Sequence, residues 1–323
     1  MLRRSLLILL QVVVTTAAIL YVFHDPGKRA EIGGALRRAD KTWIALGCVC
    51  YACVEIAATV RWHLLLGIQR ISLGWFRTGA IVIIGLFFNV FLPGLVGGDV
   101  VRLYYIFRLA PRKKLPGSLS IVMDRLLGLL AIVFLSAIVL VVRFSWLTQV
   151  PETAQLAYFA LALLGGGFLC VALLFTMARP DRVRKLPRRI PFRNSMDKFG
   201  QALGAYRKHY VSTGIAFAIT IVSQMAYYTS YYCAGASLHR SSARTPSLLD
   251  ILSIMPLVNT FTAVPISFGG VGIRETLFQR LLGHLSGVPE PIAVLTASLG
   301  FTIQALCGLL GGAIYLFWRP RRA

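Results

Sequence analysis

The chain has 323 residues, of which 57% are hydrophobic and 14% charged, and its formal net charge is +22. Soluble domains carry about 25% charged residues, so this composition excludes an ordinary soluble protein and indicates one that crosses a membrane several times. The basic residues lie in short segments between apolar runs, which is typical of membrane topology and argues against nucleic acid as a partner.

Six apolar runs are long enough to cross the hydrocarbon part of a bilayer as helices. In chain order they are Ser5–Phe23, Thr42–Val60, Gly117–Val142, Gln155–Met177, Val211–Leu238 and Ile292–Trp318. We therefore predict an all-α integral membrane protein with six spanning helices, in which residues 1–323 form a single membrane domain.

Two further apolar stretches, Phe76–Ala110 and Leu248–Leu285, are interrupted at "PGLVGGDVVR" and "PISFGGVGIR". The interruptions share the pattern P-x-x-x-G-G-x-x-x-R, and an Asn precedes each proline. The matching residues are Pro93, Gly97, Gly98 and Arg102 in the first stretch and Pro265, Gly269, Gly270 and Arg274 in the second, while Asn89 and Asn259 precede their prolines at unequal distances. Each interrupted stretch is third in a series of four apolar segments, which predicts two repeats, about 1–150 and 151–323.

The distribution of positive charge favours two re-entrant hairpins over two full crossings. With hairpins and a cytoplasmic N-terminus, 23 of the 34 Lys and Arg residues lie on the inside, including ten in Arg179–Lys208. Full crossings would place Arg112–Lys114 outside. The hairpin topology predicts inverted repeats and cytoplasmic termini. The basic segments predict anionic lipid headgroups as their neighbours.

Four stretches closely resemble the membrane region of lysylphosphatidylglycerol synthetases and of stand-alone flippase-like membrane proteins. They are "RWHLLL" from Arg61, "FLPGLVGGDVVR", "MDRLLGLLA" from Met123 and "PISFGGVGIRE". The resemblance implies an inner-membrane protein that moves a lipid or a lipid-linked group between leaflets. In the full-length synthetases an aminoacyl-transferase domain follows the membrane region, whereas this sequence ends at "WRPRRA", so the resemblance does not imply synthase activity.

The paired glycines and the arginines that follow them are the candidate headgroup site. Gly97–Gly98 and Gly269–Gly270 each precede an apolar segment, so we expect helices to begin there. The glycines form either tight turns for packing or helix N-termini directed at an anion within the membrane. Arg102 and Arg274 are either interfacial charges, with Arg102 paired to Asp99 at i, i+3, or planar forks that hold a phosphate.

Other polar residues at membrane depth are candidates for the same site or for coupling. They are Asp99, Asp124, Arg125, Glu55, Glu275, Asn89 and Asn259. Asp99 is most simply a helix N-cap. Asp124 and Arg125 lie about 10 Å into an apolar run, where a mutual or interhelical ion pair is expected. Glu55 is either a proton-titrating group or a hydrogen-bonding partner of a neighbouring helix.

Three further patterns have simple structural interpretations. The tyrosines at 227, 228, 231 and 232, with Gln224 one turn earlier, are typical of a membrane-interface belt. Gly308 and Gly312 favour close helix packing. The six cysteines lie in apolar runs and are expected to be small hydrophobic residues instead of metal ligands.

No catalytic, metal or cofactor motif stands out in the sequence. The resemblance and the two interrupted stretches instead predict translocation of an anionic phospholipid or polyprenyl-linked lipid, without a cofactor. The alternatives are a membrane-embedded glycosyl- or aminoacyl-transferase that modifies a lipid, and an accessory subunit of a lipid-biosynthetic enzyme. A transferase needs clustered acids or nucleophiles, and the long basic loop offers only Asp181 and Asp197.

Overall fold

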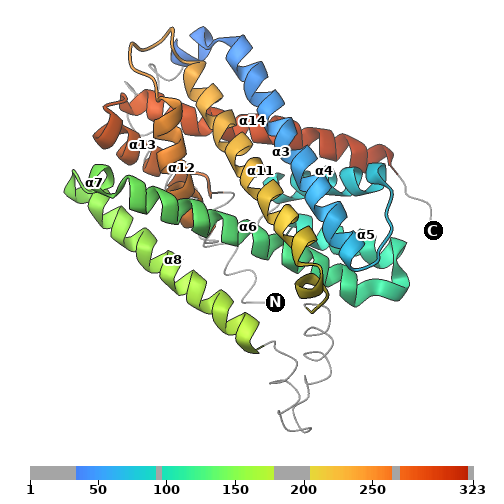
Figure 1. Ribbon diagram of the computed structural model, residues 1–323. Coiled ribbons are helices and arrows are strands. Elements are labelled where there is room, and N and C mark those ends of the chain that lie inside the picture. The colour runs from blue at the N-terminus through green and yellow to red at the C-terminus, as the bar shows by residue number, and fades with distance from the viewer. Residues whose placement is uncertain (1–33, 92–96, 178–203, 264–269, 319–323) are drawn as a thin grey trace, which may run out of the picture.

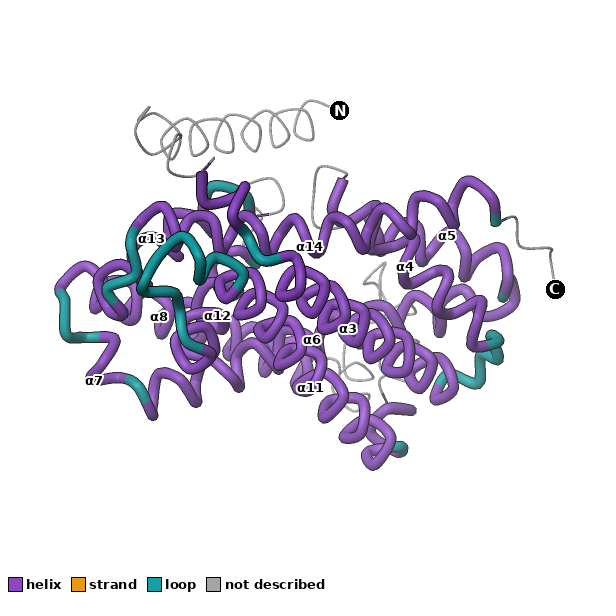
Figure 2. The backbone as a smooth tube through the Cα atoms, turned by 90° about the horizontal axis from the view of Figure 1, so that it is seen from above, coloured by secondary structure: helices purple, strands orange, loops and turns teal. Residues whose placement is uncertain are grey.

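The computed structural model describes residues 34–91, 97–177, 204–263 and 270–318, and every regular element within these ranges is a helix (Figures 1 and 2). The expected all-α class is therefore confirmed. The first predicted span, Ser5–Phe23, and most of the basic loop Arg179–Lys208 lie outside the described residues.

The helices follow one another with short connections in most places. Their bounds are α3 Lys41–Ile68, α4 Trp75–Phe91, α5 Gly97–Leu109, the 3-10 turn η1 Pro111–Lys113, α6 Lys114–Val142, α7 Phe144–Leu147, α8 Pro151–Met177, α11 Tyr210–Ala236, α12 Leu248–Thr262, α13 Ile273–Ser286 and α14 Glu290–Phe317. Side-chain caps define some of these boundaries. Asp40 accepts a hydrogen bond from the Thr42 N–H (2.9 Å) at the start of α3, and Ser247 and Asp250 form a capping box on α12.

Within the described residues, four helical stretches are long and apolar enough to cross a membrane: α3, η1 with α6, α11 and α14. Each of them overlaps most of one predicted span, although the ends differ, and α8 contains a fifth, Gln155–Met177. The protein is therefore a multi-pass membrane protein. Helix α3 continues to Ile68, beyond the predicted end at Val60, because Arg61 and His63 find partners on neighbouring elements.

Both interrupted stretches consist of two helices, as the sequence indicates. Helix α5 begins at Gly97, in agreement with the prediction. Helix α13 begins at Ile273, so the predicted start at Gly269–Gly270 is wrong by about one turn; Gly269 itself lies outside the described residues. The reason is that Gly270 and Gly272 have φ values of 78° and 85°, a left-handed conformation that a right-handed helix excludes.

Each of these helix pairs returns toward the end from which it started. The Ser286 hydroxyl, at the end of α13, donates to the Asp250 carboxylate in the first turn of α12 (2.8 Å). Similarly, Ile71, just before α4, shares a buried cluster with Leu109 at the end of α5. Figure 1 shows the pair α4 and α5 at one end of the molecule and the pair α12 and α13 at the other.

Helices α3 and α11 lie antiparallel along the centre of the molecule (Figure 1). The Asp40 N–H donates to the Ser237 carbonyl at one end (2.8 Å), and the Tyr206 hydroxyl donates to the Leu65 carbonyl at the other (3.4 Å). A Cβ on Gly47 would lie 3.4 Å from the Cys233 Cβ, so the absence of a side chain there lets the two backbones approach.

Helix α14 packs closely against α4 through glycines. A Cβ on Gly312 would lie 2.8 Å from the ring of Phe87, and one on Gly308 would lie 3.6 Å from the ring of Phe91. The predicted role of Gly308 and Gly312 in close helix packing is therefore confirmed.

Candidate functional site

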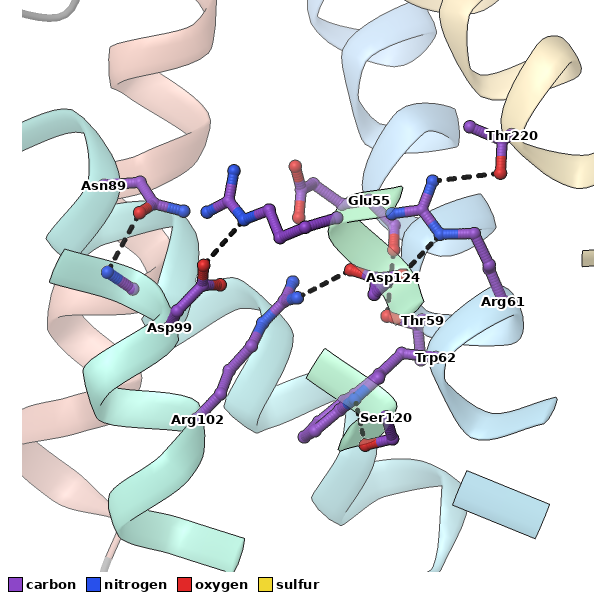
Figure 3. A network of polar contacts seen from close by, with 12 residues as sticks. Glu55, Thr59, Arg61, Trp62, Asn89, Asp99, Arg102, Ser120, Asp124 and Thr220 are labelled. Atoms are coloured by element: carbon purple, nitrogen blue, oxygen red, sulfur yellow. Dashed lines mark hydrogen bonds and ion pairs between the residues drawn. The ribbon is translucent and has the colours of Figure 1, made fainter. Parts of the chain in front are cut away.

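A buried carboxylate on α6 joins two arginines from two other helices (Figure 3). Asp124 accepts from Arg61 Nε of α3 at Oδ1 (2.6 Å) and from Arg102 Nη1 of α5 at Oδ2 (2.9 Å). The side chains of Asp124 and Arg102 are only 4% and 9% exposed. The three helices are thus held together by charges inside an otherwise apolar bundle.

Neighbouring side chains fix the two arginines in place. The Arg102 guanidinium lies over the ring of Trp62, 5.2 Å from its centroid, and the Trp62 indole N–H donates to Ser120 Oγ (3.2 Å). Arg61 also donates through Nη1 to Thr220 Oγ1 of α11 (3.3 Å). A cation stacked on an aromatic ring and bonded to a carboxylate has little rotational freedom, so the group is preorganised.

A second ion pair lies beside the first. Arg125 Nε of α6 donates to Asp99 Oδ2 of α5 at 2.6 Å. Asp99 is not the helix N-cap that the sequence suggested, because α5 begins at Gly97 and places Asp99 within its first turn. Nor does Arg102 pair with Asp99: both residues bind α6 instead. Of the two expectations for Asp124 and Arg125, the interhelical one is confirmed.

The first turn of α5 is closed by a side chain from α4. The Gly98 N–H donates to Asn89 Oδ1 (2.9 Å), so one of the free amides of this helix start is already bonded. A Cβ on Gly98 would lie 2.6 Å from Asn89 Nδ2 and would collide with the Gly85 carbonyl oxygen. Gly98 is therefore required for close packing, and the arginines are better placed than this amide to hold an anion.

The Glu55 carboxylate lies among these side chains in Figure 3, and its residue is half-buried. Within the described residues the site thus gathers three arginines, Arg61, Arg102 and Arg125, and three acids, Asp99, Asp124 and Glu55. With every group ionised the formal charges cancel, which keeps the cost of burying them low while no ligand is bound.

The second interrupted stretch forms a different kind of site. Arg274, at the start of α13, is 5% exposed, and its guanidinium lies over the rings of Tyr231 (5.7 Å) and Phe301 (5.3 Å). The Glu275 carboxylate caps α13, because its Oε2 accepts from the Gly272 N–H at 2.6 Å. This arginine is surrounded by aromatic rings, whereas Arg102 is held by a carboxylate.

Asn259 does not repeat the contact of Asn89. Its Nδ2 donates to the Tyr228 hydroxyl at 3.5 Å, although both asparagines precede their interruptions. Gly270 packs between α12 and α13, where an added Cβ would lie 2.9 Å from Thr262 Cγ2 and 3.2 Å from an Arg274 nitrogen. Both interrupted stretches therefore contain two helices and a buried arginine, and they differ in their side-chain contacts.

The prediction of a tyrosine belt at the membrane interface is wrong for Tyr228 and Tyr231. Both are fully buried, and a Cβ on Gly300 of α14 would collide with the Tyr231 ring. Sequence reasoning also missed Arg61 and Trp62. The available signal was a charge inside "RWHLLL" directly after a long apolar run, since such a charge needs a partner if the helix continues.

The described helices thus define a multi-pass, all-helical membrane protein with a buried arginine–carboxylate network at an interrupted helix. Among the described residues, no group of three or more His, Cys, Asp or Glu side chains is arranged to hold a metal ion. A family model described as the lysylphosphatidylglycerol synthase TM region matches residues 8–312, and the chain belongs to this family. No curated protein matches the chain.

Proposed function

We propose that this protein moves an anionic phospholipid or polyprenyl-linked lipid between the leaflets of the cytoplasmic membrane. The observation that carries the proposal is the group formed by Arg61, Asp124 and Arg102, which lies buried among apolar helices. Charged residues are rare within membrane segments and in most cases serve substrate pathways, so a buried group of this kind suggests a substrate site.

The chemistry of the group suits a lipid phosphate. Asp124 presents one oxygen to each arginine, and a phosphate offers the same arrangement of anionic oxygens to the two guanidinium forks. Arg102 Nε is a buried donor with no hydrogen-bond partner among the described residues. A phosphate that replaces Asp124 would therefore meet preorganised positive charge with donors to spare.

The energetics require more than one such site. An unsolvated phosphate faces a cost on the order of tens of kcal/mol in hydrocarbon, whereas a hydrogen bond to a charged group contributes about 1.5–3 kcal/mol. One arginine is far from sufficient. Arg274 supplies a further buried guanidinium at a second site, and water within the path must supply the rest.

We also propose that α3–α6 and α11–α14 are inverted repeats whose interrupted helices form re-entrant hairpins. Reciprocal packing supports this, because α4 packs on α14 while α12 packs on α6. The opposite placement of the two helix pairs in Figure 1 supports it as well. Transporters built from inverted repeats hold substrates near discontinuous helices at the repeat interface.

We assign to the cytoplasmic side the end of the α4–α5 pair at which α4 begins and α5 ends, beside Arg70 and Lys113. The Lys113 ammonium donates to the Arg70 carbonyl, and Tyr206, near the end of the basic segment Arg179–Lys208, bonds to Leu65 near the same end of α3. Basic segments far apart in the sequence therefore gather at one end, as the positive-inside rule expects of a cytoplasmic face.

Lipid movement in reconstituted vesicles tests the proposal. Fluorescent phosphatidylglycerol is followed with a membrane-impermeant quencher that reports the fraction in the outer leaflet. Arg102→Gln and Arg274→Gln are each expected to slow movement about tenfold or more, because each removes hydrogen bonds to a charged group. Arg108→Gln on α5 and Arg280→Gln on α13 are matched controls, since both arginines are exposed.

Lysine at position 102 or 274 is expected to restore part of the rate, because it keeps the charge and loses the planar fork. Folding of each variant is checked by its size-exclusion profile and thermal midpoint. If both Gln variants move lipid at the wild-type rate, the arginines are structural and the proposal is wrong.

A further inference from the structure

A polar stripe on α11 connects the two arginine sites. Its residues are Thr220, Gln224, Tyr227 and Tyr231, spaced at i, i+4, i+7 and i+11, which places them on one face of the helix. At 1.5 Å per residue the stripe is about 16 Å long, roughly half of the hydrocarbon thickness.

Each end of the stripe contacts one arginine site. Thr220 Oγ1 accepts from Arg61, which also binds Asp124. At the other end, the Arg274 guanidinium lies over the ring of Tyr231. The stripe therefore runs from Arg61 of α3, which shares the Asp124 carboxylate with Arg102 of the first interrupted stretch, to Arg274 of the second.

Helix α3 covers the middle of the stripe with further polar groups. The ring of Tyr51 packs edge-on against Tyr227, with centroids 6.1 Å apart, and Glu55 lies one turn beyond Tyr51 on α3. The Tyr227 hydroxyl donates to the Tyr231 hydroxyl at 3.3 Å, which leaves the Tyr231 proton available to another acceptor.

Burial varies along the stripe in a way that fits an intermittently open path. Thr220 and Tyr231 are buried, whereas Gln224 and Tyr227 are half-buried. Helices that only pack together in a membrane combine small residues with individual polar contacts across the interface. Here the facing surfaces carry hydroxyl, amide and carboxyl groups in a continuous series.

We propose that this stripe binds the phosphate headgroup of the lipid between the two arginine sites and is its path from one to the other. This inference rests on the proposed function. The stripe offers neutral donors, two tyrosine hydroxyls and an amide, which replace some of the water of a phosphate without holding it tightly. Strong binding occurs at the arginines and weak binding between them, so the headgroup is able to leave each site.

The transport experiment compares hydroxyls on and off the stripe. Tyr227→Phe and Tyr231→Phe keep the rings and remove only the hydroxyls, and each is expected to slow phosphatidylglycerol movement about tenfold. The control Tyr228→Phe removes a buried hydroxyl that bonds Asn259, and the control Tyr232→Phe removes one next to Trp43. If these buried hydroxyls were purely structural, Tyr228→Phe would slow phosphatidylglycerol movement as much as Tyr227→Phe and Tyr231→Phe do. That result would overturn the proposal.

A labelling experiment tests binding without requiring movement. Wild-type protein is illuminated with phosphatidylglycerol that carries a photoreactive diazirine on its headgroup, and labelled residues are identified by mass spectrometry. We expect labels at Gln224 and Tyr227. The same group on the acyl chain is expected to label Val222, which is 64% exposed on a different face of α11.

The outcomes separate the two proposals. Headgroup labels confined to the ends of α11, together with full activity of the two stripe variants, overturn the stripe and leave translocation standing. Headgroup labels on the stripe without lipid movement by the wild-type protein support the stripe as a binding site and overturn the proposed function.

Discussion

Replacing Asp124 with Asn is expected to destabilise the protein more than any other removal of one carboxylate in the network. Asp124 is 4% exposed and compensates both Arg61 and Arg102, so the change leaves two buried guanidinium groups without their counter-ion. Removing one partner of a buried ion pair costs about 3–5 kcal/mol. At about 2–4 °C per kcal/mol in mid-sized proteins, the thermal midpoint should fall by roughly 5–15 °C.

Asp99→Asn is the matched control. Among the described residues Asp99 forms an ion pair with Arg125 alone, whose side chain is 45% exposed, and an ion pair with such access to solvent contributes at most about 1 kcal/mol. Both variants change one carboxylate to an amide and differ chiefly in burial and in the number of arginine partners.

Thermal unfolding in detergent, followed by tryptophan fluorescence, measures both losses. Adding Arg61→Gln to Asp124→Asn is expected to recover part of the stability, because it removes one of the uncompensated charges. If Asp124→Asn and Asp99→Asn lower the midpoint equally, the Asp124 group is not the stabilising centre that its geometry implies.

Three further results are expected. Gly98→Ala should lower the thermal midpoint through a packing cost of about 1–3 kcal/mol. The control Gly128→Ala should leave the midpoint unchanged or raise it, because no atom lies within 4 Å of the added Cβ. Equal effects of the two changes would contradict the close packing of α5. Single cysteines at Lys113 and Gln149, in a protein lacking the six native cysteines, should react with an impermeant thiol reagent from opposite sides, and labelling from one side would refute the hairpins. The hydrogen bond from the Thr42 N–H in the first turn of α3 lowers the pKa of Asp40. The stability that the ionised Asp40 carboxylate contributes is therefore present above about pH 4, and it is lost as the pH falls through the lowered pKa. Asp40→Asn should therefore lower the midpoint at pH 7 and match the wild type near pH 2, and a constant difference would contradict this.

Local sequence patterns predicted the helical class, the interruptions and the start of α5. These features depend on hydrophobicity over one segment and on the backbone freedom of glycine, and both can be read from neighbouring residues. The same reasoning placed the start of α13 too early, because only the folded chain shows that Gly270 and Gly272 adopt positive φ values. The contact of Gly308 and Gly312 with a neighbouring helix was predictable, but its partner α4 was not.

The composition and order of the apolar segments already imply a polytopic helical protein with two interrupted stretches, since membrane insertion depends on hydrophobicity and charge along the chain. The partners of the buried charges depend on packing. Asp124 binds arginines 63 and 22 residues away, whereas Asp99, three residues from Arg102, binds Arg125. Asp99 and Arg102 lie one turn apart on α5. The alignment of α5 with α6 places Asp99 opposite Arg125 and Arg102 opposite Asp124. Contacts between helices override neighbours in sequence, because buried charges gain most from well-aligned partners in a medium of low dielectric constant.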